Sequence, residues 1–161
     1  MTFHVWHAIS GAEVSEMRGH EGGVVSVDGH RVVSGSIDKS IRVWNTITGD
    51  EVMPPLRGHE DYVESVTFSP DGTMLSRFHH GRRIVSGSWD FTAPVWDVTT
   101  GAQVFPVMRE HTIGRSIMVA TSVFFSPDAS RIISQSRYES LSWDAATGLR
   151  VSANEQSDHR L

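Results

Sequence analysis

The sequence contains no cysteine. This absence excludes disulfide bonds, thiolate zinc sites, iron–sulfur clusters and a cysteine nucleophile, and it fits a cytoplasmic location. No run of about 18 apolar residues occurs, so we expect no membrane span and no membrane partner. Residues 1–7 lack the basic start and the apolar run of a secretory signal, so we expect no leader. The formal net charge of −5 argues against nucleic acid as a partner.

The chain of 161 residues is organised as a repeat. Tryptophans and histidines mark its copies, and they are Trp6, Trp44, Trp96, Trp143, His20, His59 and His111. Residues 31–38 match residues 83–90 closely, and residues 131–136 form a third copy. The segment Phe-Ser-Pro-Asp-Gly at 68–72 recurs as Phe-Ser-Pro-Asp-Ala at 125–129. Agreement at several separate motifs indicates one structural unit used three times.

Each copy has the pattern of short strands separated by turns. Residues 63–68 are rich in β-forming side chains and end at a Ser-Pro-Asp-Gly turn. No window shows a convincing helical stripe, so we expect an essentially all-β protein. The strands expected in the second copy are 63–68, 84–88, 95–97 and 103–108, and two earlier strands are expected at 3–7 and 12–18.

The Gly-His pairs at 19–20 and 58–59, with Val-Trp-Asp at 95–97 and Ser-Trp-Asp at 142–144, resemble the WD-repeat (WD40) β-propeller family. The resemblance implies blades of four antiparallel strands, here a partial propeller of about three blades plus half a blade. The implied domain covers 1–153, with a half blade at 3–18, repeats at about 19–57, 58–109 and 110–153, and a polar tail at 154–161. A softer likeness is to the WD-repeat tracts of fungal NACHT-type signalling proteins, which contain a nucleotide-binding oligomerisation domain.

The resemblance also implies a hydrogen-bonded tetrad of histidine, serine, aspartate and tryptophan in each blade. The matching residues are His20, Ser34, Asp38 and Trp44, then His59, Ser86, Asp90 and Trp96, then His111, Ser134 and Trp143. Tyr138 replaces the third aspartate, and the segment before Trp143 is one residue shorter, so we expect this tetrad to be broken. A one-residue slip would turn Trp143 to the other face unless a bulge absorbs it.

A repeated Ser-His-Asp set predicts a structural role, because a catalytic triad needs one site with an exposed nucleophile and an oxyanion hole. We therefore expect no enzyme activity, no cofactor and no metal. The basic segment 77–83 contains paired histidines that suggest a metal or nucleic-acid contact, but a solvated loop explains it better.

Family members bind protein or peptide partners through the blade tops, which implies an interaction scaffold here. The matching blade-top residues are Ile37, Tyr62, Glu64, Trp89 and Arg137. Trp89 lies outside the repeating tryptophan positions, and it serves either in partner binding or in packing between blades. Tyrosine, tryptophan and arginine are the side chains enriched at binding hot spots.

Several alternatives stay open from the sequence. Three and a half blades predict either a fragment of a longer protein or self-association of several chains to close the propeller. A sensor segment of a larger nucleotide-binding protein and a decayed repeat without autonomous function are the competing hypotheses. Residues 73–81 and the short first strand of the first repeat are either true loop variation or errors in the gene model.

Overall fold

The computed structural model describes residues 2–6, 9–20, 23–70, 82–106, 108, 112–113, 116–117 and 121–151. Every helix or strand element found in these ranges is a β-strand, which confirms the expected all-β class. Over the same ranges, no helix is long and apolar enough to cross a membrane. The inserted segment 73–81 and the tail 154–161 lie outside the described residues.

The first element is an antiparallel hairpin of β1 (Thr2–Trp6) and β2 (Glu13–Arg18). Side chains alternate along β1, as expected for a strand with one face against the protein. Phe3 and Val5 turn inward and pack against a buried cluster of Met17, Val32 and Trp44, of which the last two lie outside the hairpin. The hairpin is therefore joined to the rest of the chain by apolar contact as well as by the connection that follows it.

Three antiparallel sheets of three strands follow, and each is a simple meander. Sheet 1 consists of β3 (Val24–Val27), β4 (Arg31–Gly35) and β5 (Ile41–Asn45). Sheet 2 consists of β6 (Val63–Phe68), β7 (Arg83–Ser88) and β8 (Val95–Asp97). Sheet 3 consists of β11 (Ser122–Phe125), β12 (Arg131–Gln135) and β13 (Ser140–Asp144). A short hairpin of β9 (Thr112–Ile113) and β10 (Ser116–Ile117) precedes sheet 3.

The fourth strand of each sheet is reduced to isolated bridges in the described residues. In sheet 1 these bridges join Ile41 to Leu56 and Trp44 to Glu51. Pro54 and Pro55 lie between the two bridges, and proline has no N–H to donate to a ladder. In sheet 2 the predicted strand at 103–108 is likewise limited to bridges at its two ends. The expected four-stranded blade is present in outline, but its outermost strand is irregular.

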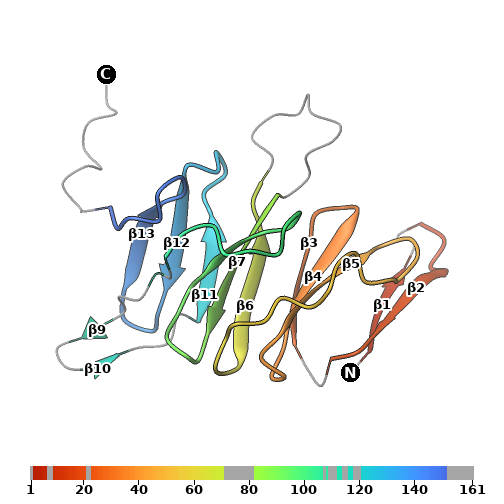
Figure 1. The fold of residues 1–161 in the computed structure, drawn as a ribbon. Helices are drawn as coiled ribbons and strands as arrows, with labels where there is room; N and C mark the ends of the chain where they lie inside the picture. Colours follow the sequence, from red (N-terminus) through yellow and green to blue (C-terminus); the bar gives the residue numbers. More distant parts are fainter. Residues whose placement is uncertain are drawn as a thin grey trace.

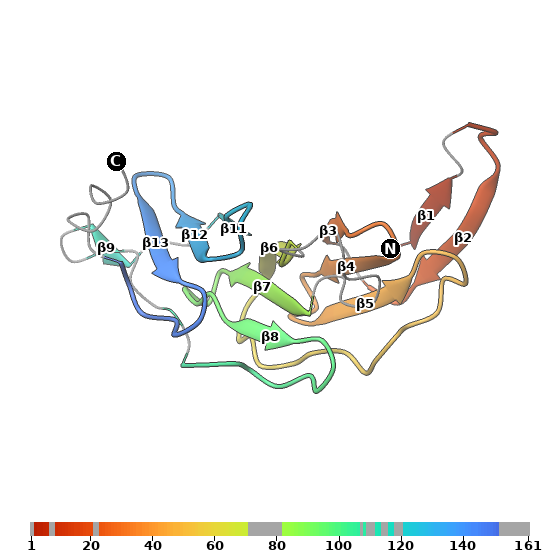
Figure 2. The same cartoon turned by 90° about the horizontal axis from the view of Figure 1, so that it is seen from above.

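The hairpin and the three sheets stand side by side in a curved row (Figure 1). Seen from above, the row forms an open arc, with β3, β6 and β11 toward one side and β5, β8 and β13 toward the other (Figure 2). The first strands also contact one another, β3 with β6 and β6 with β11. This is the arrangement of consecutive propeller blades, in which the first strand of each blade lies nearest the axis.

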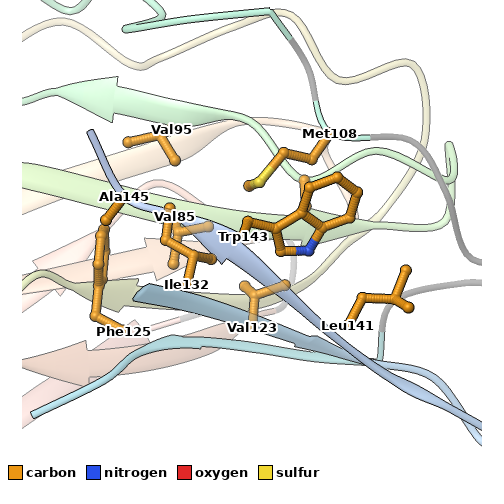
Figure 3. Close-up of a cluster of buried hydrophobic side chains, with 10 residues drawn as sticks. Val85, Val95, Met108, Val123, Phe125, Ile132, Leu141, Trp143 and Ala145 are labelled. Carbon is orange, nitrogen blue, oxygen red and sulfur yellow. The ribbon is translucent and has the colours of Figure 1, made fainter. Parts of the chain in front are cut away.

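Apolar side chains fill the space between neighbouring sheets. Between sheets 2 and 3, Val85 and Val95 meet Val123, Ile132 and Trp143 in one buried cluster (Figure 3). A second cluster joins sheets 1 and 2 in the same way. The middle strands β4 and β7 are buried along almost their whole length, because both of their faces are covered. This explains why their sequences are nearly continuous apolar and serine runs rather than alternating ones.

Pro94 shortens the third strand of sheet 2. β8 begins at the next residue and has three residues, whereas β5 and β13 have five. The carbonyl of Pro94 still accepts a hydrogen bond from the Ser86 N–H at 3.2 Å, so the chain stays close to β7. The proline thus costs ladder bonds at one end without displacing Trp96, which pairs with Ile84.

The third repeat keeps its tryptophan on the expected face although the segment before it is one residue shorter. Trp143 pairs with Ile132 just as Trp44 pairs with Val32, so both indoles occupy the same face. The difference in length lies in the turn between the second and third strands. This turn spans 136–139 in sheet 3 and is one residue shorter than the turn at 36–40 in sheet 1. Turns tolerate a change in length that a strand does not, because a strand must keep its alternation to stay packed.

Candidate partner-binding site

The tetrad of sheet 1 links four side chains from four different segments. The His20 ring meets Asp38 through Nδ1 at 2.9 Å and Ser34 Oγ through Nε2 at 2.8 Å. The Trp44 indole N–H donates to the same Ser34 oxygen at 2.8 Å. A carboxylate only accepts, so Nδ1 carries the hydrogen and, in the neutral ring, Nε2 accepts from the serine hydroxyl. The tetrad thus connects the loop before β3 with both other strands of the sheet.

Sheet 2 repeats this geometry. His59 lies 2.7 Å from Asp90 and 2.8 Å from Ser86 Oγ, and the Trp96 indole N–H donates to Ser86 at 2.9 Å. The His59 and Trp96 rings meet edge to face with centroids 6.1 Å apart. Both serines are fully buried, and a chain of hydrogen bonds in a dry interior is worth more than isolated pairs.

Sheet 3 retains only part of the set in the described residues. The Trp143 indole N–H donates to Ser134 Oγ at 2.7 Å, and Ser134 is fully buried. Tyr138 replaces the aspartate and is 61% exposed, so its side chain does not enter the tetrad. His111 lies outside the described residues. The indole-to-serine bond therefore persists in a repeat that lacks the acidic residue.

The predicted blade-top residues lie at the end of the sheets where β3, β6 and β11 begin, which faces the lower edge of Figure 1. Ile37, Tyr62 and Trp89 are each about half exposed, at 47%, 48% and 49%. Glu64 and Arg137 are also exposed. Five predicted positions, from three different repeats, are thus accessible at one end of the molecule.

Backbone and side-chain hydrogen bonds hold the centre of this blade-top surface in place. The backbone N–H of Trp89 donates to the Tyr62 carbonyl at 2.9 Å, and its indole N–H donates to Glu64 at 3.0 Å. The Val63 N–H donates to the Ser36 carbonyl at 3.0 Å. This last bond crosses from sheet 2 to sheet 1 and places Ile37 beside the segment that contains Tyr62.

The repeat of this chain matches a known protein family. The family model "WD domain, G-beta repeat" matches residues 11–45 and 51–97, half of the chain. The chain belongs to the WD40 family. It is 30% identical over 141 residues to WD repeat-containing protein 25 of Mus musculus and 31% identical over 133 residues to the guanine nucleotide-binding protein subunit beta of Zea mays. These matches cover 82% and 76% of this chain but only 23% and 33% of those proteins.

The WD40 fold is also found among solved structures. A chain in the crystal structure of the mitotic checkpoint complex superposes with a TM-score of 0.76 and 22% identity, covering 94% of this chain and 44% of the other. At this identity the similarity establishes the fold. The described sheets are therefore consecutive blades of a WD40 propeller, and the present chain spans less than half the length of each of these relatives.

Each WD40 tetrad contains one further side chain, a hydroxyl that was not predicted from the sequence. Ser40 and Thr92 follow the tetrad aspartates by two residues and donate to them, at 2.6 Å on Asp38 and 2.5 Å on Asp90. The sequence contained a pattern that could have predicted them, because both copies have a hydroxyl residue two positions after the tetrad aspartate. A hydroxyl and an imidazole thus share each carboxylate, one on each oxygen.

Hydrogen bonding controls the charge of these half-buried carboxylates. Burial by itself acts to raise the pKa of Asp90. The hydrogen bonds from His59 and Thr92 outweigh burial and hold the pKa of Asp90 below its ordinary range. The balance has the same direction at Asp38, where burial is outweighed by Ser40 and His20 and the pKa is lowered. Both aspartates are therefore charged acceptors at neutral pH.

The lowered pKa of Asp90 predicts a loss of stability in acid. Its contribution is complete above the unfolded-state pKa of about 3.9 and declines as the pH falls toward the folded-state value. We expect the free energy of unfolding to decrease below about pH 5. Asp90→Asn is expected to cost about 1–3 kcal/mol at pH 7 and to flatten this acid slope.

Urea unfolding followed by circular dichroism from pH 3 to pH 7, roughly the titration range of carboxyl groups, measures both effects. Asp50→Asn is the matched control, because Asp50 is exposed in a turn outside the tetrads. An Asp90→Asn variant with the wild-type slope and stability would contradict the proposed network.

One cavity lined by described residues lies away from the blade-top surface. It has a volume of about 410 Å³ and lies where β3, β6 and β11 end. Val27, Phe124 and Pro127 form part of its apolar lining, and Asp28 is the charged residue in it. Asp28 forms an ion pair with Arg31 at 2.7 Å. Its charge is therefore already paired within the protein, and a ligand in this cavity would be held mainly by apolar contacts.

Proposed function

We propose that this chain is a non-catalytic interaction module that binds protein or peptide partners through the blade-top surface of Ile37, Tyr62, Glu64, Trp89 and Arg137. WD-repeat proteins generally act as protein-interaction scaffolds, and a similar chain occurs in a structure named for a multiprotein complex. The proposal concerns which surface of this particular chain is used.

One observation carries the proposal. Ile37, Tyr62 and Trp89 come from two repeats, yet all three remain about half exposed at one end of adjacent blades. Large apolar side chains gathered on a surface are typical of interaction sites, and aromatic residues are the common anchors of such sites. Trp89 is also held by two hydrogen bonds, so little freedom remains to be lost on binding.

The tetrad serines support the non-catalytic part of the proposal. Ser34, Ser86 and Ser134 are all fully buried. A serine nucleophile must reach a substrate and lie beside an oxyanion hole. In this chain each serine hydroxyl lies beneath the surface and accepts from a tryptophan, so the Ser-His-Asp groups serve to join strands.

Selection from a random displayed-peptide library tests the proposed surface without assuming the chemistry of the partner. Peptides selected on the wild-type chain are expected to lose about tenfold or more in affinity for a Tyr62→Ala, Trp89→Ala double variant. The control is a Val27→Ala, Phe124→Ala double variant in the cavity, which is expected to bind like the wild type. Selected peptides that depend on the cavity residues instead would overturn the blade-top proposal.

The open arc motivates a second proposal about assembly. Among the described residues β1 pairs with β2 alone, so its other edge is available for a further strand (Figure 2). Unpaired strand edges favour pairing with additional strands. We propose that further blades, from more of the same chain or from a second copy, complete the ring. The solution mass measured by light scattering separates these two sources.

A further inference from the structure

Carboxylates surround the apolar centre of the blade-top surface on sheet 2. Glu60 and Glu64 are exposed, and Asp61 is half-buried between them and the strand. All three lie within a few residues of Tyr62, in the segment that leads into β6. This part of the surface therefore combines exposed aromatic area with a concentration of negative charge.

The hydrogen bonds made by these carboxylates leave their charge available. Glu64 accepts from the Trp89 indole at 3.0 Å, and Asp61 accepts from the Tyr62 backbone N–H at 2.8 Å. Neither donor carries a charge. Within the part of the chain that the structure describes, no ion pair involves Glu60, Asp61 or Glu64.

Two cations lie at the border of the acidic area. Lys39 donates from Nζ to the backbone carbonyl of Glu60 at 2.9 Å, and its positive charge therefore lies at the edge of the acidic segment. Arg137 lies on sheet 3 and stacks near Tyr138, with its guanidinium 5.8 Å from the ring centroid. Glu60, Asp61 and Glu64 thus give the sheet 2 portion a concentration of negative charge, with Lys39 on sheet 1 and Arg137 on sheet 3 beside it.

We propose that the partner of this surface is a positively charged protein segment in which arginine or lysine alternates with apolar side chains. An arginine over the Trp89 indole gains a cation–π contact and lies close to the Glu64 carboxylate. Apolar neighbours in the same segment pack on Ile37 and Tyr62. This inference rests on the proposed blade-top function and adds to it the chemistry of the partner.

Complementary charge has a measurable signature. It accelerates encounter and weakens as salt screens the interaction. The buried apolar contacts change little with salt, so a basic-apolar partner is expected to lose only part of its affinity when NaCl is raised from roughly 50 to 500 mM. A purely apolar partner would show almost no such loss.

Two fluorescent peptides test the inference on the full chain by anisotropy. One alternates leucine with arginine and the other alternates leucine with glutamate. We expect the leucine–arginine peptide to bind and the leucine–glutamate peptide to fail. Trp89→Ala is expected to weaken binding about tenfold or more. Glu64→Gln, which removes the charge but keeps an oxygen for the indole, is expected to weaken it about three- to tenfold.

Ile47→Ala and Asp50→Asn are the matched controls. Both residues are exposed in the turn after β5, at the opposite end of sheet 1, and both variants should bind like the wild type. Thermal melts of all four variants check that each is folded.

The outcomes separate the two proposals. Failure of the leucine–arginine peptide to bind, or wild-type affinity in Glu64→Gln, overturns the basic partner. Binding of the leucine–glutamate peptide that is lost in Trp89→Ala also overturns the basic partner but upholds the blade-top surface. Equal losses in the control variants overturn both proposals, because binding would then be unrelated to the blade tops.

Discussion

Trp96→Ala is expected to lower the free energy of unfolding by about 3–5 kcal/mol, the largest single loss among the variants considered. Trp96 is 2% exposed and packs in the cluster between sheets 1 and 2. Its removal leaves a cavity and deprives the buried Ser86 hydroxyl of the indole donor. Urea unfolding monitored by far-ultraviolet circular dichroism measures the change.

Trp6→Ala is the matched control for this prediction. Trp6 pairs with Glu13 at the place in its repeat that corresponds to Trp96 and its bridge partner Gln103. Trp6 is nevertheless 58% exposed, so its replacement is expected to cost about 1 kcal/mol or less. Equal losses at the two positions would show that the motif stabilises the protein through the hairpin itself and not through packing between blades.

Gly35→Ala is expected to destabilise the protein by about 1–3 kcal/mol through overpacking. Gly35 ends β4, and a Cβ at this position would clash with the Val63 side chain and lie 2.8 Å from Val66 Cγ1. Both valines are buried in sheet 2. The added methyl group must therefore push sheets 1 and 2 apart, and the close approach of the two blades requires glycine here.

A double variant identifies the cause of this loss. In a Val63→Ala background the space beside residue 35 is larger, so the additional cost of Gly35→Ala is expected to be smaller than in the wild type. Non-additivity of this sign is expected for residues in direct contact. Full additivity in urea unfolding would contradict the packing explanation and would point to an effect on the backbone of β4.

The third repeat shows where interpretation of the sequence reaches its limit. The motif predicts Ser134 and Trp143 correctly as neighbours, because second and third strands of every repeat have the same pairing. The shorter segment left two outcomes open, a reversed tryptophan or a bulge that absorbs the change, and the regular pairing of the two strands shows neither of them. Sequence spacing counts residues but does not distinguish a strand from the adjacent turn, and here the turn absorbs the change.

The fourth strands show a second limit. Residues 103–108 have β-forming character, but among the described positions of this range the bridges are those of Gln103 and Met108. Pro106 has no N–H to donate to a ladder, and an outermost strand has a single neighbouring strand to hold it in place. Local propensity therefore overestimates regular structure at the outer edge of the blades.

The amino-acid sequence by itself determines the repeat, the all-β class and the sets of residues that form the tetrads. These features follow from short motifs whose members lie within one repeat, and hydrogen-bond chemistry limits what such motifs can do. The motifs do not determine how exposed each side chain is, because exposure depends on packing between repeats. Trp6 and Trp96 share a motif, yet one is exposed and the other is buried. Tertiary structure likewise places Ile37 of one repeat beside Tyr62 and Trp89 of the next, since only the contact between blades brings side chains from separate repeats onto one surface.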